Sequence, residues 1–220
     1  MTAWVLTLQV VGLAMLWVLP LGALLGLVLA RVTRPWVRAL DALVVLPLVL
    51  PPSVTGYLLL RLLGRRGLVG RWLERAFDWR LVFTQSAAVI AVAVVALPLM
   101  AKGVEGAVRR VDPQLEEMAR VHGLSQWACW WRVTLPLARP GLVGAALLAG
   151  LRALGEFGAT LVFAGYVPGE TATVPLEIYM ALQTGRDALA RGLVLSLSGV
   201  SALATLAITA WSRRERLASH

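Results

Sequence analysis

The sequence has very few of the residues with which proteins build metal sites and disulfides. Among its 220 residues there is one cysteine, Cys129, and there are two histidines, of which His220 is the last residue. A single cysteine excludes an intrachain disulfide and a cysteine metal cluster, and two histidines leave little with which to ligate zinc. We therefore expect no metal or cofactor to be bound by this chain itself.

A phosphate-binding loop is also missing. The sequence has no G-x-x-x-x-G-K-[ST] pattern, and its nearest glycine-rich piece, "GRRGLVGR", lacks the Lys-Ser/Thr ending that holds nucleotide phosphates. Glu156 is the one acidic residue that we expect within a membrane span, whereas an intramembrane enzyme needs clustered His, Cys or carboxylates. The sequence therefore predicts a protein that is not an enzyme, and any ATP hydrolysis must come from another chain.

Long apolar runs dominate what is present. Hydrophobic residues make up 59% of the chain and its mean hydropathy is +0.76, against an apolar share of about 45–50% in soluble domains. Several runs exceed the roughly 18 residues that indicate a transmembrane helix. The predicted spans are 4–30, 40–62, 82–101, 140–164 and 189–211.

These runs predict an all-α integral membrane protein with five to six transmembrane helices, in a single transmembrane domain over residues 1–220. The sixth candidate, 173–183, is short or re-entrant, because about ten apolar residues fall short of the roughly 20 that cross a bilayer. The first apolar run is longer than the roughly 7–15-residue core of a signal peptide, and no basic residue precedes it. We therefore expect it to be a retained helix.

Positive charge lies mostly between the spans. A net charge of +9 would suggest nucleic acid as partner in a soluble protein, but arginines in short loops indicate membrane topology instead. Segments 31–38, 102–139 and the tail after 211 carry 12 basic residues, and the loops of the other side carry 8. The bias predicts an outer N-terminus and a cytoplasmic C-terminus, with the basic loop at 61–80 as an exception.

A polar segment, "EEMARVHGLSQWACWWRVTLP" at 116–136, interrupts the apolar pattern. Asp112 is a suitable N-cap and Pro113 a suitable first helical residue, while Gly123 is a suitable left-handed stop. Together they predict a short helix over 113–122, with Glu116 and Glu117 near its positive end.

A second short helix is predicted over 126–133, with Ser125 as its cap and with Trp127, Trp130 and Trp131 on one face. Pro136 and Pro140 are expected to break the chain before the fourth span. Two short helices at the membrane surface fit either a simple connector or a docking element for a cytoplasmic partner, and their geometry alone favours neither.

The pattern E-x-A-x-x-x-G, nine residues, and then aliphatic-x-Leu-Pro resembles the signature loop of the permease subunits of bacterial ABC importers. One mild departure is Met118, where the family usually has alanine. In that family the loop forms a coupling helix that fits a cleft on the ATPase subunit, which implies a coupling loop at about 102–138. The matching residues are Glu117, Ala119, Gly123, Val133, Leu135 and Pro136.

Other pieces of the chain resemble the molybdate-transport permeases in particular, namely "LPLVLPPSVTGYLLL", "GRRGLVG", "LGEFGATLVFAG" and "PGETATVPLEIY". The short length also fits that group better than the longer sulfate permeases. The resemblance implies transport of molybdate across a bacterial or archaeal inner membrane by alternating access. Tungstate and sulfate or thiosulfate stay open as substrates, because molybdate, tungstate and sulfate are all tetrahedral dianions.

The resemblance also implies a set of partners. The protein partners are two copies of an ABC ATPase that binds ATP and Mg²⁺, a second copy of this permease and an extracytoplasmic substrate-binding protein. The other partners are the oxyanion and membrane lipid. No nucleic acid is expected as a partner. The outer loops at 64–80 and 166–187 are candidates for receiving the binding protein, or are simply solvated loops. A self-sufficient channel or carrier is the alternative from a different class, and it leaves the pattern at 116–136 unexplained.

A path for an oxyanion needs hydrogen-bond donors and the positive ends of broken helices. In "LVLPPSVTG", Pro51 and Pro52 break the helix, and Ser53 and Thr55 add hydroxyls beside freed backbone groups. These hydroxyls either line the path or satisfy the broken backbone.

The second candidate for the path or its gate is "RALGEFGAT" at 152–160, with Gly155, Glu156 and Thr160. Arg152 and Glu156 are four residues apart and are expected to pair on one helix face. A bare carboxylate would repel a dianion, so a buried structural or gating pair is favoured over direct substrate contact. A third reading places this stretch nearer the membrane surface.

Overall fold

The computed structural model describes the backbone of residues 2–218 and the side chains of residues 2–210, and within this part of the chain the fold is all-helical. The helices are α1 (Ala3–Arg31), α2 (Pro35–Val49), α3 (Pro52–Leu63), α4 (Leu68–Phe77), α5 (Gln85–Arg109), α6 (Pro113–Val121), α7 (Gln126–Cys129), the π-helical turn η1 (Trp130–Thr134), α8 (Leu135–Leu154), α9 (Gly158–Phe163), α10 (Val174–Gln183) and α11 (Asp187–Ala218).

Four helices are long and apolar enough to cross a membrane: α1, α5, the continuous helix Gln126–Leu154, and the Asp187–Ala210 part of α11. The bent pair α2 and α3 makes a fifth if it counts as one span. The segment predicted as a short sixth helix is α10, whose ten residues are too few to cross the bilayer.

The predicted span 40–62 begins earlier, at Pro35, and it is broken at Pro51 and Pro52 as the sequence indicated. The chain turns by 116° between α2 and α3. Leu50 and Pro51 adopt extended backbone angles, with ψ of 143° and 137°. Two consecutive prolines explain the turn, because neither has an N–H to donate and each disfavours a helical conformation in the residue before it.

The predicted break at Pro136 and Pro140 is wrong, since one helix runs from Gln126 to Leu154. The π turn η1 lies directly before Pro136, and the N–H of Leu135 donates to the carbonyl of Trp130, five residues back. A π turn shifts the hydrogen-bond pattern by one residue. The helix therefore continues through a proline that falls within the first turn of α8.

Two span ends also differ from the sequence prediction. The third span was expected to end at 101, but α5 continues to Arg109. The fourth was expected over 140–164, but α8 ends at Leu154 and a separate short helix, α9, begins at Gly158. Gly155 follows the last residue of α8, with a φ of −91° that is not left-handed.

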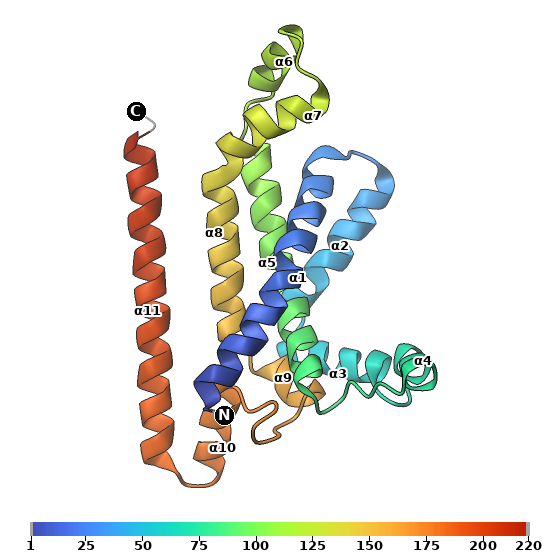
Figure 1. Ribbon diagram of the computed structural model, residues 1–220, viewed down its shortest axis with the longest axis vertical. Coiled ribbons are helices and arrows are strands. Elements are labelled where there is room, and N and C mark those ends of the chain that lie inside the picture. The colour runs from blue at the N-terminus through green and yellow to red at the C-terminus, as the bar shows by residue number, and fades with distance from the viewer. Residues whose placement is uncertain (1, 219–220) are drawn as a thin grey trace.

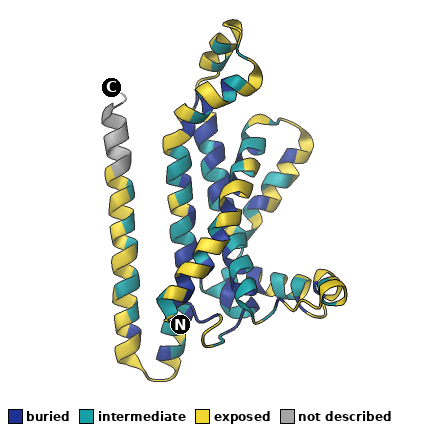
Figure 2. Cartoon of the chain, viewed as in Figure 1, coloured by how far each residue is buried: buried dark blue, intermediate teal, exposed yellow. Residues whose placement is uncertain are grey.

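Helix α5 lies at the centre of the bundle and is the most buried of the long helices (Figure 2). Its neighbours approach closely at glycines: a Cβ built on Gly26 of α1 would lie 2.5 Å from the carbonyl oxygen of Ala101, and one on Gly141 of α8 would lie 2.5 Å from the Cβ of Ala107. Small residues allow such close packing where lipid leaves no hydrophobic driving force between helices.

The elements divide between two ends of the molecule (Figure 1). The α1–α2 connection, helices α6 and α7 and the C-terminal end of α11 lie at one end, which we call the coupling end. The N-terminus, α10 and the α3–α4 region lie at the other. The basic segments 31–38 and 102–139 thus approach the same end, while the arginines after residue 211 lie outside the residues whose side chains are described.

Candidate functional site

The segment over residues 112–134 forms two short helices whose caps are those expected from the sequence. The side chain of Asp112 accepts a hydrogen bond from the N–H of Gln114 at 2.9 Å, and Ser125 Oγ accepts one from the N–H of Ala128 at 3.2 Å. Gly123 has a φ of +89°, a conformation that side-chain-bearing residues rarely adopt. The turn between α6 and α7 therefore depends on this glycine.

The three tryptophans of the segment form one cluster. Trp127 stacks on Trp130 with ring centroids 5.9 Å apart, and Trp131 meets both rings edge-on at 5.8 and 4.9 Å. Aromatic pairs at these spacings contribute beyond simple burial. The cluster gives α7 and η1 a shared aromatic face.

Glu116 joins three separate elements. Its carboxylate pairs with Arg31 at the end of α1, where Arg31 Nη1 donates to Oε2 at 2.8 Å. Its Oε1 also accepts a hydrogen bond from Thr134 Oγ1 of η1 at 2.6 Å. Burial alone would raise the pKa of Glu116, but the hydrogen bonds from Arg31 and Thr134 together lower the pKa below its ordinary value.

The sequence analysis gave Glu116 no role beyond a favourable place near the helix start. Its partner Arg31 lies 85 residues away in the sequence, so no local spacing indicates the contact. By contrast, Glu117, the residue that matches the family pattern, is exposed and is free for contact with another molecule. Of the other matching residues, Gly123 and Pro136 are exposed, while Ala119, Val133 and Leu135 are half-buried.

Large apolar side chains are exposed along the same segment. Val121 is 81% exposed and Trp127 is 70% exposed. Exposed apolar side chains gathered in a mainly polar segment are typical of a surface that contacts another protein or the membrane. The set comprises Leu115, Met118, Val121, Trp127 and Trp131.

The two candidate path segments, 51–55 and 155–160, meet at the other end of the bundle. A Cβ built on Gly56 of α3 would lie 2.7 Å from the carbonyl oxygen of Ala159, and one on Gly158 would lie 2.9 Å from Pro52 Cβ. Helix α9 therefore packs directly on the first turns of α3. Two breaks that are about 100 residues apart in the sequence form one structural feature.

Glu156 lies in the break between α8 and α9, not on a continuous helix as expected. It still pairs with Arg152, whose Nη1 is 2.8 Å from Oε2, and its side chain is 1% exposed. Its Oε1 also accepts a hydrogen bond from the N–H of Ala159 at 2.7 Å. Glu156 thus ties the end of α8 to the start of α9, while Thr160 Oγ1 donates to the carbonyl of Phe157 at 2.8 Å.

The hydroxyls near the proline break have different surroundings. Ser53 and Pro51 are exposed, as is Gly155 across the break. Thr55 is buried, and no hydrogen-bond partner reaches its Oγ1 among the described residues. Ser53 therefore lies on the surface of this chain, whereas Thr55 Oγ1 is a buried polar atom with unused hydrogen-bonding capacity.

The expectation of a single acidic residue within the spans is wrong. Asp41 lies in α2, and Glu105 lies in the part of α5 that continues beyond the predicted end at residue 101. Lys102 lies 2.9 Å from Asp41 and also pairs with Glu105, which Arg109 contacts at 2.8 Å. Arg109 also donates to the carbonyl of Leu29, near the end of α1, at 3.1 Å. This network joins α1, α2 and α5 close to the coupling end.

Comparisons with known proteins match nearly the whole chain. The molybdenum transport system permease protein ModB of Escherichia coli K12 is 42% identical over 214 residues, which cover 95% of this chain and 91% of ModB. The ModB of Mycobacterium bovis is 47% identical over 190 residues, covering 86% of this chain and 71% of that protein.

A solved structure shares the fold. It is the bacterial alginate ABC transporter in complex with its alginate pentasaccharide-bound periplasmic protein, with a TM-score of 0.75, 23% identity, and coverage of 96% of this chain and 77% of that one. A family model described as the inner membrane component of binding-protein-dependent transport systems matches residues 20–216. The chain therefore belongs to the family of inner membrane components of binding-protein-dependent transport systems.

Proposed function

We propose that this chain is the transmembrane subunit of an ATP-driven importer that carries molybdate across the inner membrane. Similarity to the molybdenum permeases over most of the chain supports the substrate class. The observation that carries the mechanism is the segment 112–134, which exposes apolar side chains at one end. Within it, Glu116 pairs with Arg31 at the end of α1 and accepts a hydrogen bond from Thr134, which lies directly before α8.

The segment 112–134 is the proposed coupling segment, with Glu117, Ala119 and Gly123 at the contact with the ATPase. The continuous helix Gln126–Leu154 begins in this segment and ends at the break beside Glu156. A displacement of the coupling segment is therefore carried along one helix to the place where α9 packs on α3. Packed interfaces shift between discrete arrangements, which suits alternating access.

The residues of the two breaks are the proposed path or gate. Pro51, Pro52 and Ser53 open the backbone at the start of α3, and a broken helix start offers positive dipole and free N–H groups to an anion. Glu156 is the proposed gating pair with Arg152 and does not contact the dianion, because its carboxylate is enclosed and already neutralised.

The proposed assembly has two copies of this chain, two copies of an ABC ATPase that binds ATP and Mg²⁺, and one extracytoplasmic binding protein. The coupling end faces the cytoplasm in this proposal, which places the N-terminus outside and the C-terminus inside. The basic segments 31–38 and 102–139, at or leading to the coupling end, support this orientation.

The first test is a gentle-detergent purification of the tagged chain from its native membrane, with mass spectrometry of the proteins that accompany it. We expect an ABC ATPase at near-equal stoichiometry. The binding protein from the same system is then titrated with molybdate, tungstate and sulfate, and we expect molybdate to bind most tightly. Recovery of the chain alone in several detergents would contradict the importer, and a preference for sulfate would contradict the substrate alone.

A further inference from the structure

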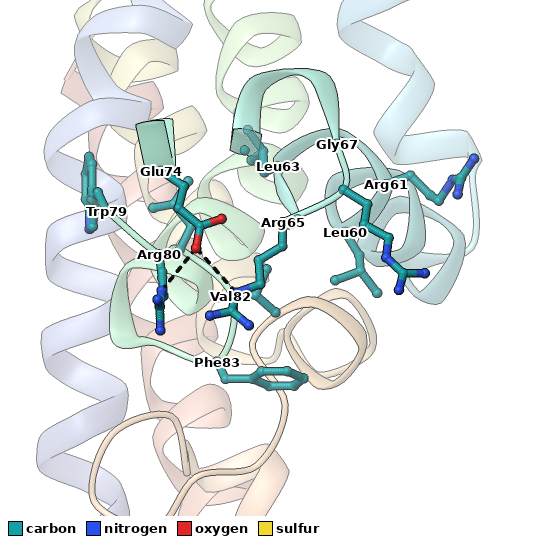
Figure 3. Close-up of a pocket in the computed structure, with 14 residues that line it drawn as sticks. Leu60, Arg61, Leu63, Arg65, Gly67, Glu74, Trp79, Arg80, Val82 and Phe83 are labelled. Atoms are coloured by element: carbon teal, nitrogen blue, oxygen red, sulfur yellow. Dashed lines mark hydrogen bonds and ion pairs between the residues drawn. The ribbon is translucent and has the colours of Figure 1, made fainter. Parts of the chain in front are cut away.

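A cavity of about 560 Å³ is lined by residues of α3, α4 and the connection that follows α4 (Figure 3). Helices α3 and α4 lie away from the coupling end (Figure 1). We call residues 52–83 the lateral arm. The cavity is separate from the coupling segment and from the candidate path residues, none of which lines it. Part of its lining falls within the loop 64–80, for which the sequence left both binding-protein contact and simple solvation open.

The cavity carries excess positive charge. Four arginines line it, and Glu74 is its single acidic lining residue. That carboxylate is shared between two of the arginines, at 3.1 Å from Arg80 and 3.6 Å from Arg65, which approach it from different sides (Figure 3). Among the described side chains, no acidic partner contacts Arg61 or Arg66 within salt-bridge distance. Guanidinium groups in such excess favour phosphate, which they bind through paired hydrogen bonds.

The rest of the cavity wall is apolar. Leu60 and Leu63 of α3 and Val82 and Phe83 of the following connection line it beside the arginines. A small inorganic anion makes no favourable contact with an apolar wall. A molecule with an anionic head and hydrocarbon chains matches both halves of the lining.

Helix α4 has the pattern of a helix that lies flat in a membrane surface. It exposes Leu68, Trp72 and Phe77 at 75%, 60% and 66%, and it also carries Arg71 and Arg75. Interfacial helices combine basic residues on one face with Trp, Phe and Leu on the other. The 116° turn after α2 directs the arm across the long helices, so α4 sits beside the bundle and not along it.

We propose that the cavity of the lateral arm binds the phosphate of an anionic phospholipid in the leaflet opposite the coupling segment. Arg65, Arg66 and Arg80 provide the guanidinium groups, while Arg61, which points away from Glu74 and Arg80 (Figure 3), only adds to the positive charge of the arm. The apolar wall receives the upper part of the acyl chains, and α4 covers the site from the membrane surface. The proposal requires only that the chain spans a membrane, and it does not depend on which substrate is transported.

The test compares two double variants that remove the same charge from the arm. Arg66→Gln with Arg80→Gln alters the cavity, and Arg71→Gln with Arg75→Gln alters α4 outside it. The complex is purified in mild detergent, supplied with phosphatidylglycerol or phosphatidylcholine, and its retained lipids are counted by native mass spectrometry. We expect the wild type and the α4 variant to retain phosphatidylglycerol selectively, and the cavity variant to retain it about tenfold less well, as loss of a charge-assisted hydrogen bond predicts.

Several results would overturn the proposal. Equal losses in the two variants would show general attraction to surface charge, and equal retention of both lipids would show no headgroup site. Displacement of phosphatidylglycerol by millimolar sulfate or molybdate would assign the cavity to a free oxyanion. Loss of binding-protein contact in the cavity variant, with lipid retention unchanged, would assign it to protein docking.

A second measurement does not depend on the variants folding. Short-chain phosphatidylglycerol added to the wild-type complex should raise its melting temperature, while short-chain phosphatidylcholine at the same concentration should not. An equal response to the two lipids would contradict a site that recognises anionic headgroups.

Discussion

The two proline pairs of this chain, Pro51–Pro52 and Pro136–Pro140, have opposite effects on the helices that contain them. At the first pair the chain turns by 116°, and at the second one helix continues from Gln126 to Leu154. The prolines of the first pair are consecutive and those of the second are four residues apart, and the contacts around the two pairs also differ.

The turn at Pro51–Pro52 and the continuous helix at Pro136 are stabilised by different kinds of contact. The Pro51 break is supported by packing, because Gly56 and Gly158 bring α3 and α9 together at backbone distance. The Pro136 joint is supported by polar contacts, because Glu116 accepts a hydrogen bond from Thr134 in the π turn and pairs with Arg31. The turn at Pro51 is stabilised by packing between helices. The helix continues through Pro136 because the hydrogen bonds of the π turn before it are shifted.

The largest effect is expected from Glu156→Ala beside the Pro51 break. The carboxylate is enclosed and pairs with Arg152, and removing one partner of a buried pair costs on the order of 3 kcal/mol. We expect a clear fall in the melting temperature of the purified chain. Arg186→Gln, which loses the exposed 3.6 Å pair with Glu177, is the control and should change little. Equal melting temperatures for both variants would contradict a structural pair at the break.

The next effect is expected from Gly56→Ala, matched against Gly106→Ala. A Cβ at Gly56 would meet the backbone of Ala159, whereas one at Gly106 would meet nothing within 4 Å. Overpacking of this kind costs about 1–3 kcal/mol, while alanine in an open helical position is neutral or slightly stabilising. Thermal denaturation of both variants provides the comparison. If Gly56→Ala matched Gly106→Ala, close packing would not be what supports the break.

Glu116→Gln tests the Pro136 joint, with its neighbour Glu117→Gln as the matched comparison. Loss of the charged contacts of Glu116 should loosen the coupling segment by about 1–2 kcal/mol, at the lower end for a partly exposed site. Limited proteolysis of the isolated permease should then cut within 112–134 faster.

Glu117→Gln should leave that proteolysis rate unchanged and instead reduce recovery of the ATPase, because Glu117 is exposed and faces outward. If Glu117→Gln accelerated the proteolysis and Glu116→Gln reduced recovery of the ATPase, our assignment of the internal contact to Glu116 would be wrong.

Gly123→Ala should strain the turn between α6 and α7 by about 1 kcal/mol, because φ is +89° there and alanine disfavours that conformation. Gly123→Trp adds bulk to the same strain and should abolish ATPase recovery while the chain still inserts. Co-purification of the ATPase measures both variants. Wild-type recovery with Gly123→Trp would contradict the proposed docking at this turn.

The smallest effect is expected from acid. The pKa of Glu116 is lowered in the folded chain, so its contribution to stability is complete above its ordinary value of 4.5 and is lost as pH falls through the lowered folded pKa. Proteolysis of the coupling segment by an acid-active protease should therefore accelerate below about pH 4 in the wild type. Glu116→Gln should already be fast and should lack this acceleration, and an identical pH profile in both would contradict the assignment.

Features with local causes could be predicted from the sequence. The caps at Asp112 and Ser125 bond to groups within three residues, and the left-handed turn at Gly123 follows from the residue itself. The long apolar helices followed from their hydropathy in the same way. Each of these features needed no knowledge of distant parts of the chain.

Features with distant causes could not be predicted. Arg31 and Glu116 are separated by 85 residues, and the contact of α3 with α9 joins segments about 100 residues apart. The prolines were read as breaks in both places because the sequence does not reveal which carbonyls a π turn rearranges. The pairing of Arg152 with Glu156 was predicted, although the helix expected to bring them together ends between them.

The most direct test of the account is uptake of labelled molybdate into liposomes that contain this chain, its ATPase and its binding protein. The account predicts uptake that requires all three proteins and ATP, and that stops when Gly123→Trp replaces the wild type. Uptake without the ATPase would show a self-sufficient channel or carrier and would contradict the coupling role of residues 112–134.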